Sequence, residues 1–167
     1  MAIVVTSTNF REGELLGHRQ VPSAAYGFGC AGENLSPQLA WSGAPPETQS
    51  FAVTCFDPDA PTGSGFWHWV LVNIPPGVQS LAEGAGNPGS ANAPAGALET
   101  RTDFGQPGYG GPCSPPGSNF HRYVFAVHAL NVASLPVNAD TSAAVVGFML
   151  GMHTIAKGEL HGIFHRS

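Results

Sequence analysis

Three apolar stretches of the chain have the pattern of buried β-strands. Residues 51–56 (FAVTCF) run into the proline-bearing segment DPDAP, and residues 67–74 (WHWVLVNI) end at a Pro-Pro pair. Residues 121–130 (HRYVFAVHAL) follow a Gly/Pro-rich segment. β-Branched and aromatic runs of this length, bounded by proline and glycine, predict strands. Both faces of residues 67–74 are mostly apolar, so we expect this strand, like residues 121–130, to lie inside its sheet.

Side chains alternate between the two faces of a strand, and this predicts which residues share a face. Along residues 67–74, Trp67 and Trp69 fall on one face and His68 on the other. Along residues 121–130, His121 and Tyr123 share a face. We therefore expect the two strands to present His68 and the His121/Tyr123 pair as the polar groups of otherwise apolar faces.

Only one segment has a convincing helical period. It covers residues 141–157, and its apolar stripe consists of Val145, Phe148, Met149, Met152, Ile155 and Ala156. Asp140, Thr141 or Ser142 can cap its start, and Gly158 suits the left-handed position after its end. A short strand over residues 159–164 is expected to follow. Residues 77–111 are rich in Gly, Ala, Asn and Pro and have no apolar period, which predicts a long functional or mobile loop.

Length and composition indicate a single turn-rich, mainly β domain over residues 1–167. Charged residues make up 10% of the chain, and Gly 22 and Pro 15 are abundant. The formal net charge is −5 and Lys+Arg number only 6, scattered along the chain, so no basic stripe exists for nucleic acid. No apolar window is long enough to span a bilayer, and the start of the chain lacks the apolar core of a signal peptide. We therefore predict a cytoplasmic protein.

The cysteines do not form a recognisable framework. Cys30, Cys55 and Cys113 are odd in number and lack CxxC spacing, which argues against both a disulfide scaffold and a zinc site. In the predicted cytoplasmic location we expect reduced thiols. No cofactor and no metal site are expected.

Candidate chemistry centres on the turn that follows residues 51–56. Asp57 and Asp59 lie in Asp-Pro-Asp-Ala-Pro, where two prolines restrict the backbone, and we expect a cis X-Pro bond there. A hairpin would bring His68 beside this acidic turn. His121 and Tyr123 directly follow the Gly/Pro loop, whose amides can face an anion. These groups together predict a small site for a phosphate-bearing head group.

Other interpretations of the same residues have less support. Asp57, Asp59, His68 and His121 are metal ligands by type, but no compact spacing such as HxH or HExxH accompanies them. Asp-rich turns also occur for structural reasons, and a lone histidine in an apolar strand is usually a packing residue. No Gly-x-Ser-x-Gly elbow is present, and Cys113 has no evident base.

Six motifs occur in order along the chain. They are Gly32–Pro37 (GENLSP) with Trp41-Ser42-Gly43, DPDAP at 57–61, WHWVLVNIP at 67–75, Asp103-Phe104-Gly105, GYGGPC at 108–113, and His121-Arg122-Tyr123. In combination they resemble the phosphatidylethanolamine-binding protein family, in particular its bacterial Raf-kinase-inhibitor-like branch. The resemblance extends from about residue 10 to residue 164.

The resemblance implies an antiparallel β-sandwich with one longer C-terminal α-helix near a small anion-binding pocket. The lining expected from the matching positions is Asp57, Asp59, His68, Gly111, Pro112, Cys113, Pro115, His121 and Tyr123. The chain departs from the family pattern in three places. Ser114 interrupts a run of prolines, Thr102 replaces a common Asn, and Phe164-His165-Arg166 stands where the family usually closes with a Tyr-Gly-Arg-like sequence.

Function is expected to be non-enzymatic binding of a small phosphate-containing or other anionic ligand. The alternative is a protein inhibitor of a kinase or protease that acts through surface contacts. A third, less favoured alternative is a hydrolase that uses Asp57 and His68. The low charge favours self-association, and the resemblance favours a homodimer.

Overall fold

The computed structural model describes residues 2–167 and is built mainly of strands. The strands are β1 (Val4–Thr6), β2 (Leu39–Ser42), β3 (Ser50–Asp57), β4 (Phe66–Ile74), β5 (Ser80–Leu81), β6 (Leu98–Glu99), β7 (His121–Leu130) and β8 (Thr154–Phe164). The helix α1 covers Ala143–His153, and a 3-10 turn, η1, covers Ala24–Tyr26. The predicted strands at 51–56, 67–74 and 121–130 are confirmed to within a residue or two of their ends.

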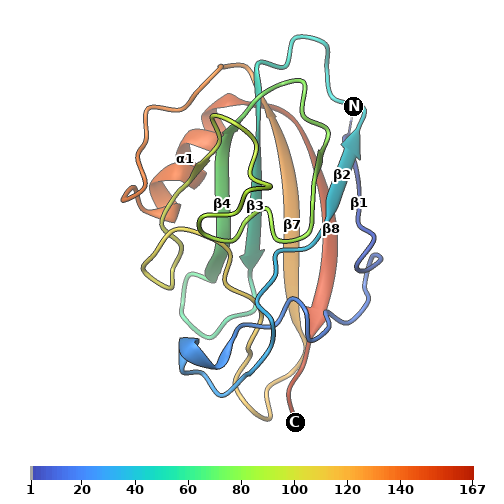
Figure 1. Cartoon of the computed structure of the whole chain (residues 1–167), viewed down its shortest axis with the longest axis vertical. Helices are drawn as coiled ribbons and strands as arrows, with labels where there is room; N and C mark the ends of the chain where they lie inside the picture. Colours follow the sequence, from blue (N-terminus) through green and yellow to red (C-terminus); the bar gives the residue numbers. More distant parts are fainter. Residues whose placement is uncertain (1) are drawn as a thin grey trace.

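The named strands form two antiparallel sheets. One has the order β1-β2-β5 and the other the order β6-β4-β3-β7-β8. In Figure 1 the long strands stand side by side, with α1 against one face and with β1 and β2 on the opposite side. The mainly β, antiparallel sandwich with one long helix is therefore confirmed, and β4 and β7 are both interior strands, as predicted.

Two apolar cores lie on the two faces of the five-stranded sheet. The larger core joins it to the three-stranded sheet and includes Trp41, Phe51, Trp69 and Phe125. The smaller core joins it to α1 and includes Val70 and Val146. Because β3 and β4 have cores on both sides, their apolar residues are buried on both faces, which explains their near-continuous apolar sequences.

β4 does not alternate regularly, because a β-bulge interrupts its pairing with β3. Cys55 pairs with Trp69 and the next residue, Phe56, pairs with Trp67, so His68 is an extra residue in the ladder. Trp67 consequently packs against the α1 core while Trp69 lies in the core between the sheets. The prediction that the two tryptophans share a face is wrong. The bulge turns His68 toward the side of the sheet where Tyr123 lies.

The helix is shorter than the predicted 141–157 and buries a different face. Ser142 caps it by accepting a hydrogen bond from the Val145 amide, and after His153 the chain passes directly into β8. Gly158 lies within β8 and pairs with Val127, so it is not a helix cap. The final strand is correspondingly longer than the predicted 159–164.

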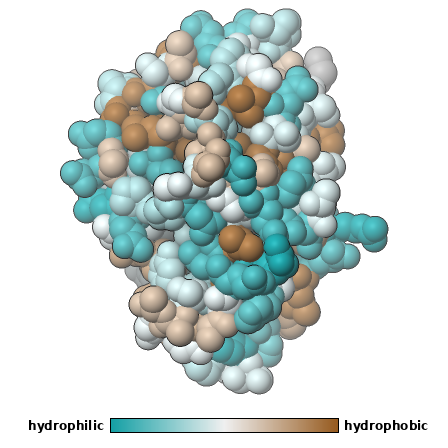
Figure 2. Space-filling model, in the orientation of Figure 1, coloured by the Kyte–Doolittle hydropathy of each residue, from teal (hydrophilic) through white to brown (hydrophobic). Residues whose placement is uncertain are grey.

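The predicted apolar stripe of α1 is wrong as a description of its buried face. Ala143, Val146 and Leu150 are buried, whereas Val145, Phe148 and Met152 of the predicted stripe are exposed. Almost every position of this helix is apolar, so its sequence does not distinguish the two faces. In Figure 2 a hydrophobic area lies at the upper left, in the part of the view where Figure 1 draws α1. No helix within residues 2–167 is long and apolar enough to cross a bilayer.

Candidate functional site

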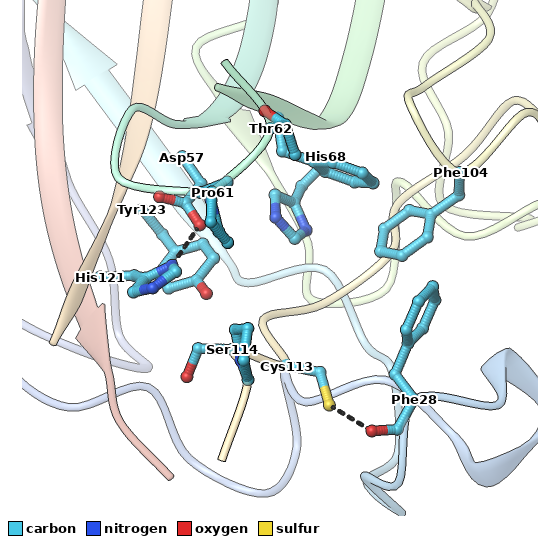
Figure 3. Close-up of a pocket in the computed structure, with 13 residues that line it drawn as sticks. Phe28, Asp57, Pro61, Thr62, His68, Phe104, Cys113, Ser114, His121 and Tyr123 are labelled. Atoms are coloured by element: carbon cyan, nitrogen blue, oxygen red, sulfur yellow. Dashed lines mark hydrogen bonds and ion pairs between the residues drawn. The ribbon is translucent and has the colours of Figure 1, made fainter. Parts of the chain in front are cut away.

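A cavity of about 200 Å³ lies at the end of the large sheet where β3 ends and where β4 and β7 begin. Figure 3 shows Asp57, His121 and Tyr123 on one side of it, His68 above, and Phe28 and Phe104 opposite. Its lining consists of Phe28, Asp57, Ala60, Pro61, Thr62, Phe66, His68, Phe104, Cys113, Ser114, Pro115, His121 and Tyr123. Six of the nine residues that the sequence analysis named are in this set, namely Asp57, His68, Cys113, Pro115, His121 and Tyr123.

Asp57 and His121 form a buried pair at the base of the cavity. The Nδ1 atom of His121 lies 2.8 Å from Oδ2 of Asp57, and the two residues are 5% and 2% exposed. The other carboxylate oxygen, Oδ1, accepts a hydrogen bond of 2.8 Å from the Asp59 amide. The turn at 57–61 thus orients Asp57 with its own backbone, and the carboxylate in turn orients the His121 ring.

That turn holds its geometry without the predicted cis bond. Every peptide bond among residues 2–167 is trans, including those that precede Pro58 and Pro61. The prediction of a cis proline is wrong. The hydrogen bond from the Asp59 amide to Asp57 closes the turn instead.

The loop around Gly110 crosses the start of β4 and fixes the position of His68. Its Nδ1 atom lies 2.8 Å from the carbonyl oxygen of Gly110, and the Gly110 amide donates to the His68 carbonyl. Its ring meets those of Phe104 and Tyr123 edge-on, at centroid distances of 5.4 and 5.1 Å. Burial among these rings lowers the pKa of His68, although the Gly110 carbonyl and the charge of Asp57 oppose the shift.

Tyr123 brings a phenol into the space between the two histidines (Figure 3). Burial, followed by the negative charge of Asp57, raises its pKa well above the ordinary value of 10.0. The hydroxyl therefore keeps its proton throughout the physiological pH range and can donate a hydrogen bond to a ligand.

Asp59 is not part of the cavity lining and forms a separate ion pair on the outside of the sheet. Its two carboxylate oxygens accept hydrogen bonds from Arg122 Nε at 3.0 Å and Nη2 at 2.9 Å, and Oδ2 also accepts from the Arg122 amide. The Arg122 side-chain hydrogen bonds are the main reason that the pKa of Asp59 lies below its usual value. Arg122 follows His121 in β7, and alternation carries its side chain to the opposite face.

The loop at 108–115 contributes only its second half to the cavity. The Gly111 amide donates to Asn34 Oδ1 at 2.9 Å, so this amide does not face a ligand, and Pro112 is buried behind it. A Cβ atom at Gly111 would lie 1.9 Å from the Gln20 carbonyl oxygen, which explains why glycine stands there. Of the four predicted loop residues, Cys113 and Pro115 reach the cavity, whereas Gly111 and Pro112 support it.

A disulfide between Cys30 and Cys113 ties this loop to the segment that carries Phe28. The prediction of reduced thiols is therefore wrong for these two cysteines, while Cys55 is free and buried. Arg166 joins the same two segments, because its Nη1 donates to the Phe28 carbonyl and its Nε to the Ser114 carbonyl, both at 3.0 Å. Covalent and hydrogen-bonded links thus hold the two sides of the opening together.

Aromatic residues that sequence reasoning did not assign to the site form the opposite side of the cavity. Phe104 contacts Phe28 and Phe66, with ring centroids 5.7 and 4.8 Å apart. Phe104 belongs to the Asp-Phe-Gly motif and was therefore within reach of a sequence argument, but Phe28 and Phe66 stand in no comparable motif. The cavity accordingly has a polar inner end and an apolar rim.

Comparisons with known proteins agree on one family. The family model described as phosphatidylethanolamine-binding protein matches residues 6–165. The UPF0098 protein YbcL of Escherichia coli is 48% identical over 163 residues, which cover 98% of this chain and 87% of YbcL. The UPF0098 protein YbhB of the same organism is 47% identical over 158 residues, which cover 95% of this chain and 97% of YbhB.

Solved structures show the same relationship. The crystal structure of E. coli YbcL, described as a new member of the mammalian PEBP family, matches with a TM-score of 0.95 at 46% identity and covers 100% of both chains. The phosphatidylethanolamine-binding protein from Plasmodium vivax shares the fold, with a TM-score of 0.61 at 19% identity over 99% of this chain and 86% of its own. The chain therefore belongs to the phosphatidylethanolamine-binding protein family.

Proposed function

We propose that the chain is a non-enzymatic binding protein whose cavity holds a small phosphate-containing or other anionic ligand. One observation carries the proposal: His68, His121 and Tyr123, from two different strands, line the same cavity beside Asp57. Membership of a family of binding proteins supports it. A volume of about 200 Å³ lies below the roughly 300–1,000 Å³ of pockets for drug-sized ligands, which suits a head group and leaves acyl chains outside.

The hydrogen bonds of the cavity favour binding over covalent chemistry. A nucleophilic enzyme needs a nucleophile within hydrogen-bond reach of a base. Among residues 2–167, neither histidine of the cavity hydrogen-bonds a serine, threonine or cysteine side chain: His121 bonds Asp57 and His68 bonds a backbone carbonyl. The sulfur of Cys113 is bonded to Cys30. We expect no release of phosphate from phosphoester substrates by the purified protein, and measurable turnover would restore the hydrolase alternative.

Replacing His68 by alanine is expected to weaken the binding of phosphorylethanolamine by about 1–3 kcal/mol, the range for a lost hydrogen bond to a charged group. The measurement is isothermal titration calorimetry on both proteins, accompanied by thermal unfolding. His128→Ala is the matched control, because His128 belongs to the same sheet, bonds Thr54 and is absent from the cavity lining. If His68→Ala binds phosphorylethanolamine with unchanged affinity but loses much stability, His68 is a packing residue and does not bind the ligand.

Inhibition of a kinase or protease through surface contacts is the second candidate function. The exposed side chains of Val145, Phe148 and Met152 on α1 favour a macromolecular contact, since a contiguous apolar patch commonly marks an interaction surface. Pull-down from a cell extract tests for such a partner. The homodimer stays a prediction, and light scattering at micromolar concentration tests it by giving the mass in solution.

The Cys30–Cys113 disulfide is relevant to the cellular compartment in which the protein is found. Disulfides persist mainly in oxidising compartments, so the Cys30–Cys113 bond favours such a compartment over the predicted cytoplasm. Fractionation of cells that express the full-length protein, with thiols trapped during lysis, measures both the location and the oxidation state.

A further inference from the structure

We propose that the cavity binds its ligand as a singly protonated oxyanion, so that it accepts phosphate monoesters and discriminates against sulfate esters and phosphodiesters. The inference rests on the proposed function, because it concerns the ligand of the same cavity. His68 is the residue that makes the distinction.

One nitrogen of the His68 ring must carry a hydrogen. A carbonyl oxygen only accepts hydrogen bonds, so the 2.8 Å contact with Gly110 requires that Nδ1 of His68 carries the hydrogen. The burial of the ring disfavours a second proton. Nε2 therefore has a lone pair and no hydrogen, and it makes no hydrogen bond with residues 2–167. It is an acceptor that a ligand must satisfy with a donor.

The other histidine is constrained in a similar way. A carboxylate also only accepts, so the contact with Asp57 places a hydrogen on Nδ1 of His121. The pair then has a net charge of −1 with a neutral imidazole, or zero with an imidazolium. In neither state does it supply the net positive charge that would favour a dianion.

No other described side chain adds a positive charge to the cavity. Among residues 2–167, no lysine or arginine lines the cavity. The guanidinium of Arg166 is engaged with two backbone carbonyls, and that of Arg122 is paired with Asp59. Asp103, whose negative charge also acts on His68, accepts a hydrogen bond from the Trp67 amide. Tyr123 supplies one donor and no charge.

The chemistry of oxyanions turns this arrangement into a selection rule. A phosphate monoester loses its second proton with a pKa near 6, so near neutral pH it still offers a population with one P–OH group. That hydroxyl can donate to Nε2 of His68 while the remaining oxygens accept from Tyr123. A sulfate ester and a phosphodiester each have one negative charge and no such proton. Their oxygens would face the lone pair of His68, which leaves a buried acceptor unsatisfied.

Three related ligands test the selection rule on the wild-type protein at about pH 6. They are phosphorylethanolamine, ethanolamine O-sulfate and glycerophosphorylethanolamine, which share the same ammonium group. The sulfate ester differs from the monoester only in its oxyanion, whereas the diester also carries a glyceryl group. We expect the monoester to bind at least about tenfold more tightly than the other two by calorimetry, the ratio that corresponds to about 1.4 kcal/mol. The monoester affinity should also fall as pH rises above about 6, because its singly protonated form disappears.

Each outcome has a defined meaning. Comparable affinity for the monoester and for either of the other ligands would overturn the selection rule and leave the anion site standing. Binding of none of the three would overturn the proposed function itself, and the selection rule with it. The diester arm also separates two sources of phosphate, since an intact phospholipid head group is a diester and a free metabolite head group is a monoester.

A variant assigns the effect to His68. In His68→Gln the side-chain amide can present an N–H group to the ligand, so the preference for the monoester over the sulfate ester should shrink at least about threefold. His18→Gln, at an exposed histidine, is the control and should keep the wild-type preference. If a folded His68→Gln protein keeps the wild-type preference for the monoester, a group other than His68 accepts the hydrogen bond from the P–OH group. The wild-type ligand series remains decisive if this variant does not fold.

Discussion

Replacing Cys30 and Cys113 together by serine is expected to lower the free energy of unfolding by about 4–5 kcal/mol. The disulfide spans 83 residues of sequence, and a cross-link that closes so long a loop removes much conformational entropy from the unfolded chain. The measurement is chemical denaturation of the wild type and of the double variant under non-reducing conditions.

Reductant provides the control for that experiment. Treatment of the wild type with a reductant should reproduce the loss of stability, whereas the double variant should not respond, because its remaining Cys55 is already a free thiol. A wild-type protein whose stability is the same with and without reductant would show that the cross-link contributes little.

The stability of the wild type is also expected to fall by about 3–5 kcal/mol between pH 4.5 and pH 8 because of Glu99. Oε1 of this side chain accepts a 2.9 Å hydrogen bond from Trp69 Nε1, but Oε2 is buried without a partner. Burial raises the pKa of Glu99 from 4.5 to about 8, although the Trp69 bond opposes the shift. Between these two values the unfolded chain has lost the proton that the folded protein retains, so rising pH favours unfolding. Above about pH 8 the loss is complete.

Glu99→Gln isolates this effect from the other titrating groups. The variant should be more stable than the wild type at pH 8 and close to it at pH 4.5, as measured by urea denaturation at both values. Glu47→Gln, at an exposed position, serves as the control and should leave the pH dependence unchanged. An equal difference between Glu99→Gln and the wild type at both pH values would contradict the assignment.

The regular strands were the part of the fold that sequence could predict. β7 pairs with β8 without interruption over residues 121–129 and with β3 over residues 124–130, so alternation correctly places His121 and Tyr123 on one face. The same rule fails in β4, because the extra residue at His68 has no signature in composition. The resulting change of face depends on how β3 pairs with β4, which is a property of two segments and not of one.

The residues of the candidate site likewise fall into those that the sequence predicts and those that depend on contacts between distant segments. Asp57, His68, His121 and Tyr123 were predictable because each is a polar residue at the end of an apolar strand. The Cys30–Cys113 bond was not, since it depends on the folds of two loops that meet only in the finished structure. The same holds for Phe28, which reaches the cavity through that contact. Asp59 lies in the same turn as Asp57, but its carboxylate pairs with Arg122 outside the cavity, and the sequence of the turn does not show this.

The arrangement of β8 has a consequence for how the protein is made. β8 is synthesised after the seven other strands described, yet it forms an edge of the large sheet and binds a segment near residue 16, where the Leu16 amide donates to the Ile163 carbonyl. Arg166, which links both sides of the cavity opening, emerges later still. The nascent chain therefore cannot complete the cavity until residue 166 has left the ribosome. Until then the large sheet lacks β8, one of its two edge strands.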